Sequence, residues 1–239
     1  MFDDLDALAR AAAEEIAKSA QEAIAKRGRF TIALSGGSTP RPVYRLLANA
    51  PRIDWRRVHV FWGDERHVPP DDPESNFGMA HDELLSKIPI PQENIHRMRA
   101  ENPNAERAAE EYSWTLRSAF DLAEGEWPRF DLVLMGIGDD GHTASLFPGS
   151  DAVREQSRLV IAPWVEKLHT QRITLTPPVF NRARLALFLV SGEEKANALK
   201  AVLDGDFEPD LYPAQIVKPE EGRLVWMVDR AAARWLLEE

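Results

Sequence analysis

The sequence predicts an α/β fold in which helices cover both faces of a mostly parallel β-sheet. Short apolar runs alternate along the chain with longer segments of helical periodicity, the pattern of strand–helix–strand units. The run at 184–190 is apolar at nearly every position, which is typical of a strand buried on both faces. Glycine-rich or polar turns follow several of these runs directly, and such turns mark the ends of strands.

The elements follow from this alternation, starting with an amphipathic helix over residues 3–27. Apolar residues recur there every three or four positions, and Gly28 ends the helix. Further helices are predicted at 41–49, 76–87, 104–123, 192–203 and 230–238. Strands are predicted at 30–34, 58–62, 130–135, 158–162, 171–176, 184–190 and 224–228. No repeat or low-complexity tract divides the chain, so we expect one domain over residues 1–239.

Composition narrows the function. The chain has 239 residues, no cysteine and a net charge of −10, so disulfide and thiolate chemistry are unavailable and no nucleic-acid partner is expected. No stretch approaches 18 consecutive apolar residues, and the acidic N-terminus lacks the apolar segment of a signal peptide, so no membrane partner is expected. We expect a cytoplasmic protein, a monomer or weak oligomer, that acts on a small molecule.

Residues 35–40, Ser-Gly-Gly-Ser-Thr-Pro, form a donor-rich turn between a predicted strand and a predicted helix. Gly36 and Gly37 let the backbone turn sharply and bring its N–H groups close to a ligand, and Ser38 and Thr39 add hydroxyls. Together with the helix N-terminus, these groups suit a phosphate. The alternative is an ordinary strand–helix turn with a helix N-cap.

Residues 135–149 hold the best candidate for acid–base chemistry, because a predicted apolar strand ends there in Gly-Asp-Asp-Gly-His. His142 can take or give a proton near neutral pH, and Asp140 is close enough to orient it. Asp139 is the other possible partner, and a capped turn with a solvated histidine is the non-catalytic alternative. No second histidine or cysteine cluster accompanies these residues, so no metal is expected.

Three cations and one acid complete the candidate site. Arg66 follows a predicted strand and offers a planar fork for a phosphate or a developing oxyanion. Asp64, beside it, is expected to hold the loop by accepting backbone N–H bonds. Lys195 opens a predicted helix, where a cation is unfavourable for the helix dipole, and Arg172 projects from one face of a strand. The alternatives are mutually paired surface charges, a solvated lysine and a structural ion pair for Arg172.

The segments that carry Ser38, Arg66, His142 and Lys195 each follow an apolar strand. Strand ends share one edge in a parallel sheet, and ligands bind outside that edge in open α/β folds. The sequence therefore predicts one pocket that combines a phosphate cradle, several cations and an acid–base histidine.

Three ordered motifs, at 35–40, 63–69 and 136–149, resemble those of the lactonases in the glucosamine-6-phosphate isomerase/6-phosphogluconolactonase family. The resemblance runs from about residue 30 to residue 230. It implies a Rossmann-like sheet and hydrolysis of 6-phospho-D-glucono-1,5-lactone to 6-phospho-D-gluconate, a step of the oxidative pentose phosphate pathway. No cofactor is implied, and the partner is the phosphorylated sugar lactone itself.

The resemblance also implies a role for each candidate residue. His142 would be the general base that activates water, Asp140 would orient it, and Arg66 would stabilise the substrate or the oxyanion. The substrate phosphate would lie on the 35–40 turn, with its charge neutralised by cations. The residues expected to bind the substrate are Gly36, Gly37, Ser38, Thr39, Asp64, Arg172 and Lys195.

Two other functions are alternatives. The glucosamine-6-phosphate deaminases of the same family share the Ser-Gly-Gly-Ser-type loop and the Gly-x-Asp-Gly-His turn. They tend to carry tyrosine where this chain has Arg66, and a functional acid after their histidine that is missing from residues 143–148. Both differences favour the lactonase. A non-catalytic sugar-phosphate sensor on the same fold is the third possibility.

Overall fold

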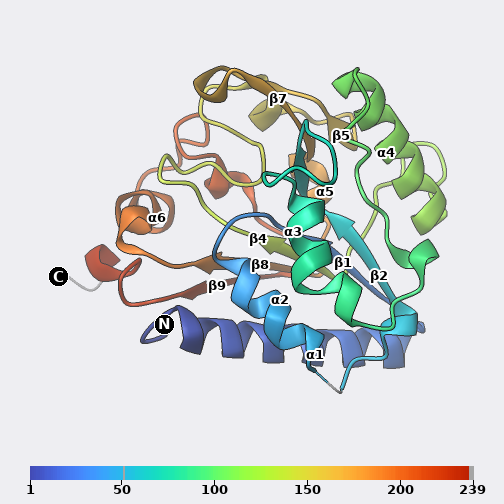
Figure 1. Ribbon diagram of the computed structural model, residues 1–239. Helices are drawn as coiled ribbons and strands as arrows, with labels where there is room; N and C mark the ends of the chain where they lie inside the picture. Colours follow the sequence, from blue (N-terminus) through green and yellow to red (C-terminus); the bar gives the residue numbers. More distant parts are fainter. Residues whose placement is uncertain (51, 237–239) are drawn as a thin grey trace.

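Five parallel strands form the central sheet in a computed structural model that describes residues 1–50 and 52–236 (Figure 1). They lie in the order β2-β1-β4-β8-β9. Their bounds are β1 Phe30–Leu34, β2 Val58–Trp62, β4 Leu132–Met135, β8 Leu185–Val190 and β9 Arg223–Val228. Every residue of β1, β4 and β8 is buried, so these strands are covered on both faces, as their apolar sequences predict.

Helices cover the sheet, and the longest of them ends at the glycine that the sequence predicts. Helix α1 (Leu5–Arg27) begins at Asp4, whose side chain accepts a hydrogen bond from the Ala7 N–H, and ends at Gly28, where φ is 79°. The other α-helices are α2 Pro40–Ala48, α3 Asn76–Glu83, α4 Ala105–Phe120, α5 Pro177–Asn181 and α6 Ala196–Asp204. In Figure 1, α1 runs along beneath the sheet and α4 lies above it.

The strand register brings the carboxyl ends of the parallel strands to one edge. Leu34 pairs with Trp62 at the ends of β1 and β2, and Val190 pairs with Val228 at the ends of β8 and β9. Strand β2 lies on one side of β1 and β4 on the other, so the strand order reverses between β1 and β4. The crevice outside such a reversal is the usual ligand site of an open α/β sheet.

A smaller antiparallel sheet accompanies the parallel one. Its strands are β3 Asp64–Arg66, β5 Val160–Ile161, β6 Trp164–Val165 and β7 Thr170–Leu175. Strand β7 pairs with β3, β5 and β6, so the strands predicted at 158–162 and 171–176 exist but do not extend the parallel sheet. The segment that carries Arg66 is itself a strand, rather than the loop that the sequence predicts.

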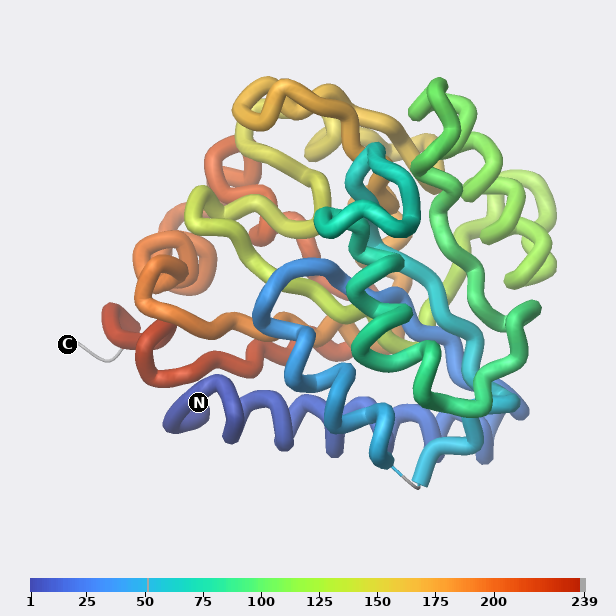
Figure 2. Tube along the Cα trace, in the orientation of Figure 1, coloured from blue at the N-terminus to red at the C-terminus, as the bar shows by residue number. Residues whose placement is uncertain are grey.

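The N-terminus lies beside the segment that follows β9, because Phe2 pairs with Asp229 (Figure 2). The helix predicted over 230–238 is wrong for its described part, which is a turn followed by the 3₁₀-helix Arg234–Leu236, and residues 237 and 238 lie outside the described residues. No helix in the described chain is long and apolar enough to cross a membrane.

One hydrophobic cluster spans both sheets. It includes Val133 of the parallel sheet and Ile173 of the antiparallel sheet, each fully buried. We therefore still expect one domain over residues 1–239, because the two sheets share a core.

Candidate active site

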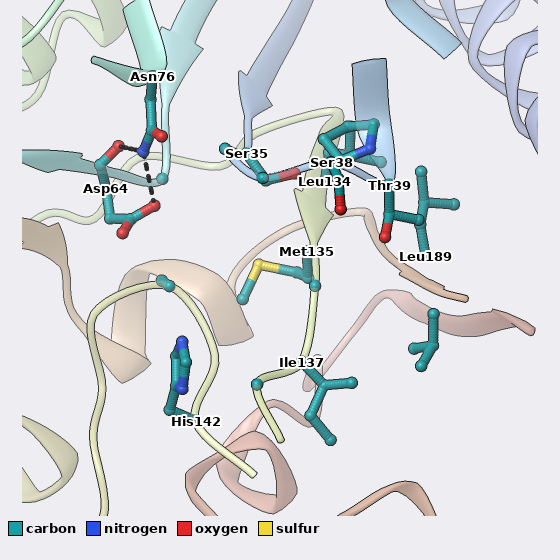
Figure 3. Close-up of a pocket in the computed structure, with 18 of the residues that line it drawn as sticks. Ser35, Ser38, Thr39, Asp64, Asn76, Leu134, Met135, Ile137, His142 and Leu189 are labelled. Atoms are coloured by element: carbon teal, nitrogen blue, oxygen red, sulfur yellow. Dashed lines mark hydrogen bonds between the residues drawn. The ribbon is translucent and has the colours of Figure 1, made fainter. Parts of the chain in front are cut away.

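A cavity of about 210 Å³ opens at the carboxyl edge of the parallel sheet, next to the reversal between β1 and β4 (Figure 3). Segments that follow β1, β2, β4 and β8 contribute to its wall, as the sequence predicts. Among the residues expected at the site, those that line the cavity are Gly36, Gly37, Ser38, Thr39, Asp64, Arg66, His142 and Lys195. Asp140 and Arg172 are not part of this lining. Asp140 contacts His142, and Arg172 lies directly opposite Arg66 in the register of β3 and β7.

The turn after β1 is fixed by a buried tyrosine and by two glycines. The Tyr44 hydroxyl accepts a hydrogen bond from the Ser35 N–H at 3.1 Å and donates one to the Ser35 carbonyl at 2.7 Å. Gly37 has a φ of 95°, a conformation that favours glycine. A Cβ atom on Gly36 would overlap the side chain of Asn76. The two glycines thus meet different requirements, one of backbone conformation and one of space.

The same turn leaves its polar groups free to bind an anion. Within residues 1–50 and 52–236, nothing accepts a hydrogen bond from the backbone N–H groups of 36–39. The Thr39 side chain makes no capping hydrogen bond at the start of α2, which removes the N-cap alternative. The Ser38 and Thr39 hydroxyls point into the cavity (Figure 3). Free N–H groups at a helix N-terminus, with two hydroxyls, suit a phosphate.

The turn after β4 presents His142 to the cavity. Its Nδ1 donates a hydrogen bond to Asp140 Oδ1 at 2.5 Å, so the lone pair of the neutral ring lies on Nε2. The ring stacks on Phe147 with 4.2 Å between centroids, and the Gly138 N–H donates to the His142 carbonyl at 2.8 Å. Nε2 has no hydrogen-bond partner in the described part of the chain. The imidazole is therefore oriented on one side and free to act as a base on the other.

Asp140, rather than Asp139, is the partner of His142. The Asp139 side chain is 64% exposed, whereas Asp140 is 21% exposed and accepts hydrogen bonds on both oxygens. Its second oxygen, Oδ2, accepts from Lys167 Nζ at 2.9 Å. Burial alone would raise the pKa of Asp140, but the hydrogen bonds and charges of His142 and Lys167 outweigh burial and hold that pKa well below its usual range. An ionised carboxylate here stabilises positive charge on the imidazole.

Asp64 and Glu65 join three segments, but not as the sequence predicts. Asp64 Oδ2 accepts from the Ser145 hydroxyl at 2.7 Å, and the Asp64 carbonyl accepts from the Asn76 side chain at 3.0 Å (Figure 3). Backbone N–H groups donate instead to Glu65, those of Asn76 and Phe77 each at 2.7 Å. The expectation for Asp64 was wrong because successive residues of strand β3 face opposite sides, which directs Glu65 to the start of α3. Burial raises the pKa of Glu65 to about 7, although these hydrogen bonds act to lower it.

Arg66 and Arg172 occupy directly paired positions of β3 and β7. Arg66 donates to the Glu74 carbonyl at 2.5 Å and pairs with no acid in the described chain, so the self-paired alternative is not seen. Arg172 is 9% exposed and likewise has no ion pair there. Burial and the charge of Arg66 lower the pKa of Arg172. Two adjacent guanidinium groups that form no ion pair within the described residues favour an anion nearby.

Lys195 reaches the cavity from the segment after β8. It ends the 3₁₀-turn Glu193–Lys195, and α6 follows directly, so the helix predicted from residue 192 begins with a tighter turn. No acid within residues 1–50 and 52–236 pairs with the Lys195 amine, so its charge is available to a ligand. The solvated-lysine alternative does not explain why this residue lines the cavity.

Three residues of the site have no role in the sequence analysis. Asn76 and Ser145 both bond to Asp64, and both belong to conspicuous motifs, Pro-Glu-Ser-Asn-Phe-Gly-Met and Thr-Ala-Ser-Leu-Phe-Pro, that could have drawn attention to them. Lys167 contacts Asp140 from a short hairpin turn, and no local signal marks it. In the described ranges, no group of three His, Asp or Glu side chains is arranged to hold a metal.

The fold and the cavity together define an α/β protein that can hold a small anionic ligand beside a histidine–aspartate pair. The model of the family described as glucosamine-6-phosphate isomerases/6-phosphogluconolactonase matches residues 3–226. The chain therefore belongs to this family.

Individual relatives fit the same family. The 6-phosphogluconolactonase of Nostoc sp. is 44% identical over 204 residues, which cover 85% of this chain and 83% of the relative. That of Haemophilus influenzae is 41% identical over 234 residues, with 95% and 97% covered. The crystal structure of 6-phosphogluconolactonase from Thermotoga maritima superposes with a TM-score of 0.82 at 33% identity, with 96% and 97% covered.

Proposed function

We propose that this protein is a lactone-hydrolysing enzyme that converts 6-phospho-D-glucono-1,5-lactone to 6-phospho-D-gluconate in the pentose phosphate pathway. The observation that carries the proposal is the placement of His142, whose free Nε2 shares one cavity with the donor-rich turn at 36–39. A base and an anion cradle so placed fit a substrate with a phosphate at one end and a reactive carbonyl at the other. The relatives named as 6-phosphogluconolactonases support the same substrate.

The proposed mechanism begins with water. His142 Nε2 removes a proton from a water molecule as its oxygen attacks the lactone carbonyl carbon. Asp140 stabilises the imidazolium that forms, and Arg66 stabilises the negative charge on the former carbonyl oxygen. When the tetrahedral intermediate collapses, the bond from the carbonyl carbon to the ring oxygen breaks, and His142 returns its proton to that oxygen. The new carboxylic acid ionises, and the open-chain product leaves.

The phosphate end of the substrate is held away from this chemistry. Its oxygens accept hydrogen bonds from the N–H groups of Gly37, Ser38 and Thr39 and from the two hydroxyls. Lys195 and Arg172 offset its charge, Lys195 from the cavity wall and Arg172 from the strand position directly opposite Arg66. Asp64 and Gly36 shape the cavity between the two ends, and Asp64 keeps Ser145 and Asn76 in place.

Glucosamine-6-phosphate deamination is the rival reaction within the same family. Arg66 in the cavity wall and the absence of an acid from residues 143–148 both weigh against it. A sugar-phosphate sensor would need no free base, yet His142 Nε2 is held free by the Asp140 hydrogen bond. Lactone hydrolysis therefore accounts for the arrangement of His142 better than either rival function does.

The test is a pair of assays on the purified protein. One couples freshly made 6-phosphogluconolactone to the detection of 6-phosphogluconate, with the spontaneous rate subtracted, and the other measures ammonia released from glucosamine 6-phosphate. We expect turnover only in the first. Ammonia release without lactonase activity would establish the deaminase, and ligand binding without turnover in either assay would establish the sensor.

We further infer that the enzyme works in the cytoplasm as a monomer or weak oligomer, without a cofactor. The net charge of −10 suits neither nucleic acid nor an anionic lipid surface, and the proposed chemistry needs only protein side chains and water. Sedimentation equilibrium over a range of concentrations tests the oligomeric state, and activity retained after dialysis against a chelator tests the lack of a metal.

A further inference from the structure

Lys167 contacts the turn of His142 from an element that the proposed mechanism does not use. It lies in the 3₁₀-turn Glu166–Leu168, which joins β6 to β7 of the antiparallel sheet. Its Nζ atom is 2.9 Å from Asp140 Oδ2 and 3.7 Å from Asp139 Oδ1. The side chain is 60% exposed and does not line the cavity, so it has no direct route to the substrate.

The Asp140 carboxylate is held by two partners on different elements. Oδ1 accepts from His142 Nδ1, and Oδ2 accepts from Lys167 Nζ. The carboxylate plane cannot rotate about the Cβ–Cγ bond without breaking one of these bonds. The imidazole orientation therefore depends on a residue of the antiparallel sheet as well as on its own turn.

We infer that Lys167 is a positioning residue for the proposed hydrolysis: it locks Asp140 in the orientation that holds the His142 imidazole and its free Nε2 toward the cavity. Its kinetic consequences rest on the proposed function, whereas the contact itself does not. An exposed lysine–carboxylate pair contributes little to stability, so the main effect of Lys167 is on the orientation and charge of the Asp140–His142 dyad.

The charges that act on Asp140 set the sign of the expected pH effect. His142 from its own turn and Lys167 from the hairpin both favour the ionised carboxylate, and Asp139 shares the lysine. Tyr212, from the segment before the 3₁₀-helix at 213–216, packs against Gly141. Losing the Lys167 cation raises the pKa of Asp140 and favours the protonated form of the Asp140–His142 dyad. The acidic limb of activity then moves to higher pH.

The experiment compares Lys167→Met with Lys167→Arg and with Lys200→Met. Lys200 pairs with Asp204 at 3.3 Å on α6, away from the cavity lining, so its variant controls for loss of an exposed lysine–aspartate pair. For Lys167→Met we expect kcat at pH 7 to fall about three- to tenfold at unchanged KM. The acidic limb of the kcat profile moves to higher pH. Lys167→Arg restores most of both, and Lys200→Met matches the parent protein.

A second measurement does not need turnover. The ¹³C shift of the Asp140 carboxyl, followed by NMR against pH, reports its protonation directly, and in Lys167→Met the titration moves to higher pH. Unchanged carboxyl titration and an unchanged acidic limb would overturn the inference, and so would a rise in KM alone, because that indicates a substrate contact. If the protein proves to lack lactonase activity but the carboxyl titration still moves, the proposed function fails and the positioning role stands.

Discussion

Loops that leave the strand ends of the parallel sheet line the cavity, whereas the antiparallel sheet lines it with Arg66 and places Arg172 and Lys167 next to residues of the site. From the first come the turn at 36–39, His142 and Lys195. From the second come Arg66 and Arg172, directly paired. In the proposed mechanism, the first group binds the phosphate and moves protons, and the second presents two guanidinium groups that form no ion pair within the described residues. We propose that the two sheets thus have different roles, the parallel sheet in phosphate binding and proton transfer and the antiparallel sheet in stabilising negative charge.

This difference between the sheets explains why the base and the charged residues lie where they do. A base needs a fixed orientation, and the turn of His142 provides it with a stacked ring and a bonded Nδ1. A charge acts over a longer distance, so Arg172, opposite Arg66 and outside the cavity lining, can act on the ligand without touching it. We expect variants of the His142 turn, and of Lys167 that supports it, to change kcat, and variants of Arg66 to change KM as well.

The largest expected effect is at His142. His142→Ala removes the base, so kcat falls about 10²–10⁴-fold while 6-phosphogluconate still binds to the phosphate turn. Steady-state kinetics on the lactone and calorimetric titration with 6-phosphogluconate measure the two parts separately. Unchanged turnover would remove His142 from the mechanism and would place the chemistry elsewhere in the cavity.

The next-largest effect tests whether the orientation of the His142 imidazole matters as much as its presence. A Cβ atom at Gly138 would overlap the His142 ring, whereas at Gly136, in the same turn, it would meet nothing within 4 Å. Gly138→Ala displaces the imidazole, and kcat falls by about 10², the cost of a misplaced group. Gly136→Ala serves as the matched control and keeps most of the parent activity. Equal kinetics for both variants would contradict the importance of the ring position.

The antiparallel sheet is tested at Arg66. Arg66→Ala removes an unpaired cation from the cavity wall, and kcat/KM falls about 10- to 100-fold, with both kcat and KM affected. Arg66→Lys recovers part of the loss, because the charge returns without the planar fork. A loss confined to kcat, with KM untouched, would break the division between the two sheets.

The smallest effect lies away from the cavity, at the stacked pair His59 and His96, whose Nδ1 and Nε2 are 3.1 Å apart. Burial, with the charges of His59 and Arg29, lowers the pKa of His96 to about 4, so folding stability is intact above pH 6.5 and declines as pH falls toward 4. After allowing for its partial exposure, we expect a loss of about 1–2 kcal/mol. Denaturant unfolding at pH 7.5 and pH 5 measures it.

The control for this pair is His96→Phe, which keeps an aromatic ring against Phe61 and cannot be protonated. Its unfolding free energy depends less on pH than that of the parent, and its kcat at pH 7.5 is unchanged. A parallel loss of activity would connect this region to the site, and identical pH dependence would mean that His96 is not responsible.

The same contrast between the two sheets explains which parts of the structure could be predicted from the sequence. Strands 30–34 and 58–62 are found at those residues, because short runs with four apolar residues out of five carry their own signal. The carboxyl edge that these strands share with the other parallel strands then places Ser38, His142 and Lys195 in one cavity. The convergence of loops follows from a rule that holds for parallel sheets in general.

The antiparallel sheet could not be predicted in the same way. Strand β3 is Asp-Glu-Arg and β6 has two residues, too short for any alternation to be recognised. The pairing of Arg66 with Arg172 joins residues far apart in the chain, and so does the contact of Lys167 with Asp140. The exchange of roles between Asp64 and Glu65 has the same cause, since only strand geometry decides which of two neighbours faces the cavity.

The proposal that both sheets contribute to one substrate site is tested most directly by a crystal structure with bound 6-phospho-D-gluconate. The phosphate is expected on the N–H groups of 36–39 beside Lys195, with the carboxylate end within hydrogen-bond distance of His142 Nε2 and Arg66. A ligand bound in the reverse direction, with its phosphate at His142, or bound outside this cavity, would contradict the division of work between the two sheets.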